Sequence, residues 1–216
     1  MKQLILVGAG SWGLEVHSWF EHQDVIGCDT EWQLKGFLDD NEAVFENLPD
    51  YQPLFLSTID HYQPAENDVF VCTVADPVIK EGIIARLEKK KVEFITLKHR
   101  TALFYGDSPI GKGCVFAANS LISIQIIIGD HVGVNVGCSL GHNVEIGDYS
   151  QLSSQVNLAG FVKIGKKVSI GSSACFIPQA MAEDSSIIGA GSVVLNKVKT
   201  GTTVFGNPAK VIFSSQ

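Results

Sequence analysis

Residues 140–176, LGHNVEIGDYSQLSSQVNLAGFVKIGKKVSIGSSACF, have an apolar residue at every sixth position. The same period extends from Ile110 to about Lys199 and gives fifteen units. The fifteen anchor residues are Ile110, Phe116, Ile122, Ile128, Val134, Leu140, Ile146, Leu152, Leu158, Ile164, Ile170, Phe176, Ala182, Ile188 and Val194. The chain is 45% hydrophobic, so an unbroken run of fifteen would arise by chance about once in 10⁵ sequences. The period is therefore a structural repeat.

A six-residue period matches neither an α-helix nor a long flat strand, but it matches a short strand followed by a tight corner. In eleven of the fifteen units the residue after the anchor is glycine, alanine or serine, which suits such a corner. The pattern predicts a parallel β-helix in which three units form a triangular coil of eighteen residues. Residues one coil apart should stack at a distance of roughly 4.8 Å. Ala182 is the weakest anchor, and near Pro178 we expect a loosened coil or a small loop.

Before the repeats, strand and helix patterns alternate, which predicts a small parallel sheet with helices on its faces. Strands are expected at Gln3–Val7, Lys35–Leu38, Asp68–Thr73 and Val92–Leu97, with one helix after the glycine turn 8–13 and another beginning at Asp76-Pro77. We place the domain boundary so that residues 1–103 form the α/β domain and residues 104–216 form the β-helix with a C-terminal cap.

The glycine turn has the pattern G-x-G-x-x-G, formed by Gly8, Gly10 and Gly13. Backbone amides of such a turn, at the N-terminus of a helix, can accept a phosphate or pyrophosphate. The second strand ends in Asp39-Asp40, about twenty-six residues after Gly13, which is a loose but usable spacing for binding ribose hydroxyls. Because the domain is short, a mononucleotide-sized ligand is more plausible than NAD.

Composition excludes several classes of partner. The chain has 216 residues and a net charge of −7, without a basic patch interleaved with aromatic residues, so nucleic acid and anionic membrane surfaces are poor partner candidates. The apolar run 121–128 is too short to span a bilayer, and the N-terminus enters an apolar strand with no room for a signal peptide. The cysteines lack a C-x-x-C pair, and we interpret them as reduced core thiols of a cytoplasmic protein. They are Cys28, Cys72, Cys114, Cys138 and Cys175.

Two histidines occur in the repeat segment, and both fall at corners. His131 is expected to be solvated. His142 lies two residues after its anchor, and the residue eighteen positions later is Gly160, which presents a backbone N–H with no side chain in front of it. A carbonyl held between a base and an amide donor suits acyl transfer, so His142 is a candidate general base.

Other chemistry at these residues is less favoured. His131 and His142 are eleven residues apart without a close third histidine, which does not favour a zinc site. A serine or cysteine nucleophile paired with His142 stays open, although Cys138 falls at an inward-packing position and we interpret it as core.

Five pieces of sequence occur in a specific order along the chain. They are VGAGSWG at 7–13, GFLDDN at 36–41, Gly141-His142, IGAGSVV at 188–194 and GNPAK at 206–210. In this combination the chain resembles, over essentially its whole length, the nucleotide-sugar and sialic-acid acetyltransferases of the NeuD/PglD type. The resemblance implies a small Rossmann-like α/β domain that holds a nucleotide sugar, followed by an all-β left-handed parallel β-helix. It also implies a homotrimer with acetyl-CoA, the acyl donor, in the groove between neighbouring subunits, and no metal.

The resemblance also assigns roles to individual positions. His142 matches the family's general base, Asn135 matches an active-site asparagine, and Asn143 adjoins the base. The positions that match residues near the coenzyme are Gly160, Gly189, Ala190 and Lys210. The positions assigned to the nucleotide-sugar pocket are Gly8, Gly10, Ser11, Trp12, Gly13, Asp39 and Asp40.

Three positions depart from the family pattern. Some relatives have Glu directly after the histidine, where this chain has Asn143, so the group that orients the imidazole is open. Gln151 stands where some relatives have a second histidine. Trp12 is bulkier than the residue often found in that turn, and we expect it to reshape the nucleotide-sugar pocket.

We therefore expect transfer of an acetyl group from acetyl-CoA to an amino or hydroxyl group of a nucleotide-linked sugar, in surface-glycan biosynthesis, with His142 as base. Two alternatives are kept. An NAD(P)-dependent oxidoreductase would use the glycine turn, but it leaves the repeat domain without a purpose. A non-catalytic trimer that binds nucleotide sugar and CoA is motivated by Asn143 and Gln151.

Overall fold

The computed structural model describes residues 1–26, 31–47 and 49–214, and the chain divides into two compact units, Met1–Leu97 and Lys98–Gln216. The division lies six residues before the boundary expected from the sequence. The reason is that β6 (Leu97–Lys98) joins the same sheet as β8 (Val115–Phe116), and β7 (Leu103–Phe104) pairs with β9 (Leu121–Ile122). The connecting segment is thus already part of the repeat unit.

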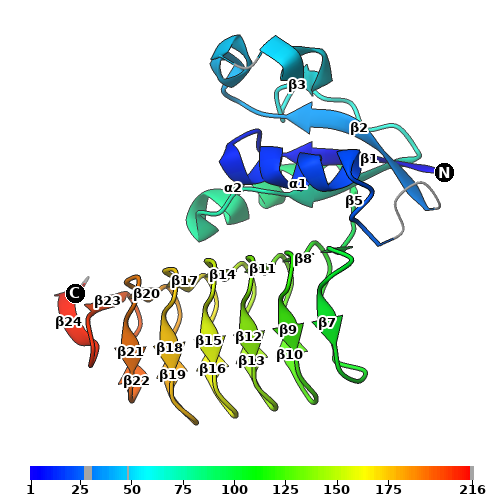
Figure 1. Cartoon of the computed structure of the whole chain (residues 1–216). Helices are drawn as coiled ribbons and strands as arrows, with labels where there is room; N and C mark the ends of the chain where they lie inside the picture. Colours follow the sequence, from blue (N-terminus) through cyan, green and yellow to red (C-terminus); the bar gives the residue numbers. More distant parts are fainter. Residues whose placement is uncertain (27–30, 48, 215–216) are drawn as a thin grey trace. The chain divides into compact units, whose positions relative to one another are not determined.

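The first unit is a parallel sheet with strand order β3-β2-β1-β4-β5, in which each of the described pairings is parallel. Its elements are β1 (Lys2–Val7), α1 (Ser11–Glu21), β2 (Trp32–Leu38), the 3-10 helices η1 (Glu42–Asn47) and η2 (Pro49–Leu54), β3 (Phe55–Ser57), β4 (Asp68–Cys72), α2 (Pro77–Glu88) and β5 (Glu93–Phe94). In Figure 1 this unit runs from blue to green, with η1 and η2 beside β3 at one edge of the sheet. The sequence patterns did not predict η1, η2 or β3.

The centre of this sheet is apolar, as the patterns indicated. Residues 4–7 of β1 and all five residues of β4 are buried, and α1 covers the core with Val16, Trp19 and Phe20. Helix α2 begins at a cap in which the Asp76 side chain accepts hydrogen bonds from the N–H groups of Val78 and Ile79. The apolar face of α1 and the Asp76 cap of α2 are local signals, which explains why both helices were predictable.

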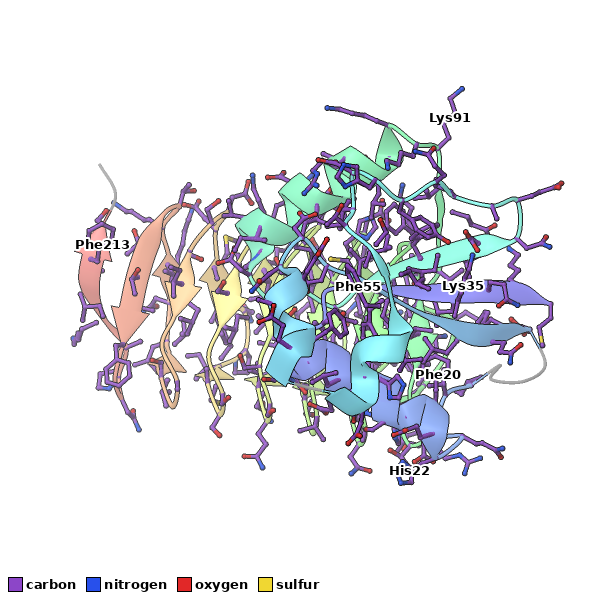
Figure 2. The ribbon with its side chains drawn as sticks, turned by 90° about the horizontal axis from the view of Figure 1, so that it is seen from above. Phe20, His22, Lys35, Phe55, Lys91 and Phe213 are labelled. Atoms are coloured by element: carbon purple, nitrogen blue, oxygen red, sulfur yellow. The ribbon has the colours of Figure 1, made fainter. Side chains whose placement is uncertain are left out.

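A buried carboxylate ties β4 to β2. The side chain of Asp68 is fully buried and accepts hydrogen bonds from Lys35 Nζ (2.7 Å), Tyr62 Oη (2.7 Å) and the Ala65 N–H (2.8 Å). Burial pushes the pKa of Asp68 up, but these hydrogen bonds outweigh it and hold the pKa below its ordinary value. Lys35 is labelled on β2 in Figure 2.

The second unit is a parallel β-helix built from two-residue strands, which confirms the prediction from the six-residue period. The further strands are β10 (Ile127–Ile128), β11 (Gly133–Val134), β12 (Ser139–Leu140), β13 (Glu145–Ile146), β14 (Gln151–Leu152), β15 (Asn157–Leu158), β16 (Lys163–Ile164), β17 (Ser169–Ile170), β18 (Cys175–Phe176), β19 (Met181–Ala182), β20 (Ile187–Ile188), β21 (Val193–Val194), β22 (Lys197–Val198), β23 (Thr202–Phe205) and β24 (Lys210–Ser214). They form three sheets, with the orders β10-β13-β16-β19-β22, β24-β23-β20-β17-β14-β11-β8-β6 and β21-β18-β15-β12-β9-β7. Figure 1 shows the coils side by side from β7 in green to β24 in red.

The anchors stack at the predicted interval of eighteen residues, for example Ile128 on Ile146 and Ile146 on Ile164. Ala182 continues this column, is fully buried and pairs with Ile164 on one side and Val198 on the other. The expectation of a loosened coil near Ala182 was therefore wrong. The ladder uses backbone groups, so it stays regular although the anchor is small. The last coil is shorter, because the interval from Ala182 to its partner Val198 is sixteen residues and not eighteen.

The corners use a left-handed residue that is usually not glycine. Non-glycine residues with positive φ recur along the coils, among them Gln125 (φ 57°), Asn143 (φ 59°) and Phe161 (φ 62°). The glycine that follows seven of the fifteen anchors has a different role, which is to allow close approach of neighbouring coils. A Cβ on Gly147 would lie 2.7 Å from the carbonyl carbon of Gly165 in the next coil.

His131 and the described cysteines differ in how far they are buried. His131 is 1% exposed and stacks on Tyr149, with ring centroids 5.6 Å apart, so the expectation of a solvated histidine was wrong. Cys138 is buried as predicted, and burial raises the pKa of its thiol to about 11. Cys175 is only half-buried, and Cys28 lies outside the described residues. Cys72 and Cys114 are buried and are not joined in a disulfide.

Candidate functional site

His142 lies on the corner between β12 and β13, and its side chain is exposed. Backbone bonds to both neighbouring coils hold this corner, because Asn143 N–H donates to Ile124 O (3.1 Å) and Phe161 N–H donates to His142 O (3.0 Å). The imidazole Nδ1 is 3.0 Å from Asn143 Oδ1. An amide oxygen can only accept, so this contact requires the proton on Nδ1 and leaves Nε2 as the basic atom. The side chain of Asn143 is thus the hydrogen-bond partner of the imidazole in the described residues.

Gly160 lies directly against the imidazole, as the eighteen-residue interval predicted. A Cβ on Gly160 would be 2.6 Å from Cε1 and 2.7 Å from Nε2 of His142, so only glycine leaves room for the ring in this position. Within the described residues, the Gly160 N–H donates to no protein acceptor. A free amide beside a base is a suitable donor for an oxyanion.

Phe161 forms the other wall around His142. The two rings meet edge to face, with centroids 5.1 Å apart and an interplanar angle of 87°. The Phe161 side chain is 50% exposed and its backbone is left-handed, which is a costly conformation for a bulky residue. Together with Lys163, Gln179 and Met181, Phe161 lines a cavity of about 420 Å³. The sequence patterns did not single out Phe161, although it lies one coil after Asn143.

Asn135 and the remaining coenzyme candidates lie at another corner of the coil. Asn135 follows β11, and its Oδ1 accepts a hydrogen bond from its neighbour, the Val136 N–H (2.6 Å). Gly189 and Ala190 follow β20, in the same sheet as β11, and Gly189 packs under the Phe205 ring. Lys210 begins β24 and borders a cavity of about 400 Å³ at the end of the coil. No contact in the described residues joins Asn135, Gly189 or Lys210 to His142.

Gln151, which stands where some relatives have a histidine, is buried in β14. Its side chain packs over Gly133, where a Cβ would lie 2.2 Å from Gln151 Oε1. The Gln151 side chain therefore lies against Gly133 of the preceding coil, and no described contact links it to His142.

The glycine turn of the first unit is held by an aspartate. Gly8 has φ +106°, and a Cβ on Gly13 would lie 2.0 Å from Gly8 O, so both positions require glycine. The Ala9 N–H donates to Asp39 Oδ2 (2.7 Å), and the other oxygen of Asp39 accepts from the Asn41 N–H (2.8 Å). One amide of the turn is thus already used, and a carboxylate stands beside it. This arrangement favours hydroxyl and N–H donors of a ligand over phosphate at this amide.

Asp40 and Arg86 face a cavity of about 550 Å³ in this unit. The Arg86 guanidinium binds both carboxylate oxygens of Asp40 (2.5 and 3.2 Å) and also reaches Asp60 (2.9 Å). The hydrogen bond from Arg86 holds the pKa of Asp40 below its ordinary value, so the carboxylate is charged at neutral pH. The residues that line the cavity are Gly8, Asp39, Asp40, Asn41, Ile59, Val74, Ile79, Gly82, Ile83 and Arg86.

Of the pocket residues predicted from the sequence, Gly8, Asp39 and Asp40 line this cavity, whereas Trp12 does not. Trp12 is buried, with the Lys80 ammonium over its ring at 6.0 Å. The side chain of Trp12 therefore packs into the core and does not line this cavity, and its effect on a nucleotide-sugar pocket stays a prediction. Gly10, Ser11 and Gly13 lie in the adjoining turn and do not line the cavity. Arg86 was missed because its approach to Asp40 spans forty-six residues of sequence.

The described residues were also searched for metal-binding groups and for membrane-spanning helices. In residues 1–26, 31–47 and 49–214, no group of three or more His, Cys, Asp or Glu side chains could hold a metal ion. Across the same part of the chain, neither helix is long and apolar enough to cross a membrane.

Comparison with known proteins shows that the chain is similar to acetyltransferases over almost its whole length. No protein-family model matches the chain. The chain is 30% identical to the GDP-perosamine N-acetyltransferase of Escherichia coli O157:H7 over 215 residues, which are 95% of this chain and 94% of that protein. The acetyltransferase domain of PglB from Neisseria gonorrhoeae FA1090, solved in complex with acetyl coenzyme A, has a TM-score of 0.81 and 25% identity over 98% of this chain and 99% of that one. PerB from Caulobacter crescentus, in complex with CoA and GDP-perosamine, has a TM-score of 0.84 over 98% and 97% of the two chains, and at 19% identity it supports the fold alone.

Proposed function

Because this chain belongs to the hexapeptide-repeat, parallel β-helix acetyltransferases of nucleotide sugars, we propose that it uses His142 to transfer the acetyl group of acetyl-CoA to an amino group of the sugar. The observation that carries the assignment is the match to an N-acetyltransferase over 95% of the chain, together with an exposed, oriented imidazole at a corner of the coil. N-acetylation is favoured over O-acetylation because that relative is an N-acetyltransferase.

The orientation of His142 supports the role of base. With Nδ1–H donated to Asn143, Nε2 is free to take a proton from the amine as its nitrogen attacks the acetyl carbonyl carbon. The tetrahedral intermediate then collapses, the carbon–sulfur bond breaks, and the imidazolium returns the proton to the CoA thiolate. The Gly160 N–H, which has no other described acceptor, is the proposed donor to the oxyanion.

The cavity of the first unit is the proposed site for the nucleotide part of the substrate. Asp39 and Asp40 keep lone pairs that can accept hydrogen bonds from ribose hydroxyls or from N–H groups of a base. Arg86 fixes Asp40, which pre-organises this edge of the cavity. We propose that the unit is Rossmann-like and that residues 1–103 of the chain include the whole nucleotide-sugar domain. GDP-linked amino sugars are the first substrates to test, because the E. coli relative is named for one.

We propose that the active enzyme is a homotrimer of left-handed β-helices, with acetyl-CoA between subunits. Asn135, Gly189 and Lys210 lie at a different corner from His142, so a single chain does not assemble the candidate residues. Three-fold association would place one corner of each subunit beside a different corner of its neighbour. Residues 211–213 of β24 are more than 60% exposed and apolar, and Phe213 is labelled at the end of the coil in Figure 2. Light scattering should give about three times the chain mass of 23.3 kDa.

The proposed cellular setting follows from the substrates. We place the reaction in the cytoplasm, where acetyl-CoA is available. The described cysteines form no disulfide with one another, which suits a reducing compartment. The product, an acetylated nucleotide sugar, is a donor for the glycosyltransferases that build surface glycans.

The test is release of free CoA from acetyl-CoA in the presence of GDP-, UDP-, dTDP- and CMP-linked amino sugars. We expect turnover with at least one of them, and we expect His142→Ala to lower kcat by about 10²–10⁴-fold while thermal stability is kept. His22→Ala removes another exposed histidine, in the first unit, and serves as the matched control.

Two results would contradict the proposal. Turnover of His142→Ala equal to the unmodified enzyme would remove the base role. Binding of acetyl-CoA without turnover on any amino sugar would favour a non-catalytic binding trimer. Calorimetry with NAD(P) separates the oxidoreductase alternative, for which we expect no binding heat.

A further inference from the structure

The hydrogen bond that orients His142 depends on a third side chain. Asn143 Nδ2 donates to Gln125 Oε1 at 3.1 Å, while Asn143 Oδ1 faces His142 Nδ1 at 3.0 Å. Gln125 lies one coil before Asn143, at the equivalent left-handed corner position. The three side chains therefore form a chain of hydrogen bonds that runs along the edge of the coil.

Catalysis depends on which end of the Asn143 amide, the oxygen or the NH₂ group, faces His142. An amide has an oxygen acceptor on one side and an NH₂ donor on the other, and the two can be exchanged by a rotation of the side chain. If the amide of Asn143 turned around, its NH₂ would face Nδ1 of His142. Nδ1 would then act as acceptor and the proton would move to Nε2, so the atom proposed as base would no longer carry a lone pair.

Gln125 Oε1 opposes that rotation. It is an acceptor, so it attracts the NH₂ group of Asn143 and disfavours the amide oxygen at the same place. We infer that Gln125 is a positioning residue, which selects the productive tautomer of His142 by fixing which way round the Asn143 amide lies. This inference rests on the proposed function of His142 and adds to it a residue one coil away.

The other groups around the imidazole leave its tautomer to the hydrogen bonds from Gln125 through Asn143 to His142, which we call the relay. The imidazole is within hydrogen-bond distance of Asn143 and forms an edge-to-face contact with Phe161, and both of these side chains are uncharged. Because no carboxylate is hydrogen-bonded to the ring in the described unit, the tautomer depends on a neutral amide whose two ends differ only in their hydrogen-bonding sense.

The test compares three variants. Gln125→Ala removes the acceptor, and we expect kcat to fall about three- to tenfold, the range for loss of one hydrogen bond. Gln125→Glu keeps an acceptor for Asn143 Nδ2, and we expect it to restore turnover. Ser185→Ala is the matched control, because Ser185 is an exposed left-handed corner residue (φ 57°) on another edge of the coil.

A spectroscopic measurement tests the inference without turnover. Long-range ¹H–¹⁵N correlation spectra, with the His142 signals assigned by their loss in His142→Gln, report which ring nitrogen carries the proton. We expect the Nδ1–H form in the unmodified protein and in Gln125→Glu, and a mixture of both tautomers in Gln125→Ala.

The outcomes separate the relay from the function of the site. Unchanged kcat and an unchanged tautomer in Gln125→Ala would overturn the relay, even if His142→Ala is inactive and the base role stands. If His142→Ala keeps full turnover, the base role fails, and the tautomer in Gln125→Ala still decides the relay. A loss of activity in Gln125→Glu equal to that in Gln125→Ala would also contradict the proposed role.

Discussion

Gly160→Ala tests the active-site geometry most directly, because the new methyl group would occupy space that the imidazole fills. The added Cβ would lie 2.6 Å from Cε1 and 2.7 Å from Nε2 of His142. Carbon atoms in contact are about 3.5–4.0 Å apart, so the ring must move by about 1 Å. A displacement of about 1 Å at a catalytic group costs on the order of 10²-fold in rate. We expect a reduction of that size in kcat.

The same substitution should have little effect on stability. The atoms in conflict belong to an exposed side chain that can rotate, and Gly160 does not have the left-handed backbone that alanine would oppose. We expect the free energy of unfolding to change by less than about 0.5 kcal/mol. Gly147→Ala is the matched comparison, because there the Cβ would meet backbone atoms of Gly165 at 2.7 and 2.8 Å. That coil must shift, at a cost of about 1–3 kcal/mol.

The assay is CoA release at saturating nucleotide sugar, combined with denaturant unfolding of the same preparations. The reasoning fails if Gly160→Ala turns over like the unmodified enzyme. It also fails if Gly160→Ala loses as much stability as Gly147→Ala, because the methyl group would then be pushing on the coil and not on the imidazole.

Two further predictions concern the wall of the site and the fold of the first unit. Phe161→Asn keeps the left-handed backbone, which asparagine tolerates, and removes the ring edge from His142. Because such aromatic contacts contribute about 1 kcal/mol, we expect kcat to fall about fivefold with no loss in melting temperature. Asp68→Asn removes the charge that Lys35 and Tyr62 bind, and should cost about 2 kcal/mol at pH 7 in denaturant unfolding. Since hydrogen bonds hold the pKa of Asp68 below its ordinary value, its stabilisation is present above about pH 4 and is lost as the pH falls further. The difference between Asp68→Asn and the unmodified protein should therefore shrink in acid, and a constant difference from pH 7 to pH 3 would contradict this explanation.

The sequence by itself determined the β-helix and one contact of the candidate site. A repeat of six residues is a local property, since each short strand and corner is specified by its own residues, and the ladder between coils then uses backbone groups alone. The eighteen-residue interval that follows from it correctly placed His142 against Gly160. The same interval leads from Asn143 to Gln125 and Phe161, and a systematic use of it would have found both.

Only the tertiary structure decided the details that depend on where side chains point. Whether a corner histidine is exposed, like His142, or buried on a neighbouring ring, like His131, depends on the side chains of the adjacent coil. In the first unit, Asp39 takes the Ala9 amide and Arg86 reaches Asp40, over thirty and forty-six residues of sequence. No local pattern encodes such contacts, because they arise when strands and helices distant in sequence pack against one another. The period of the backbone can thus be predicted from the sequence. The partners of individual polar side chains are determined only by the packing of the folded chain.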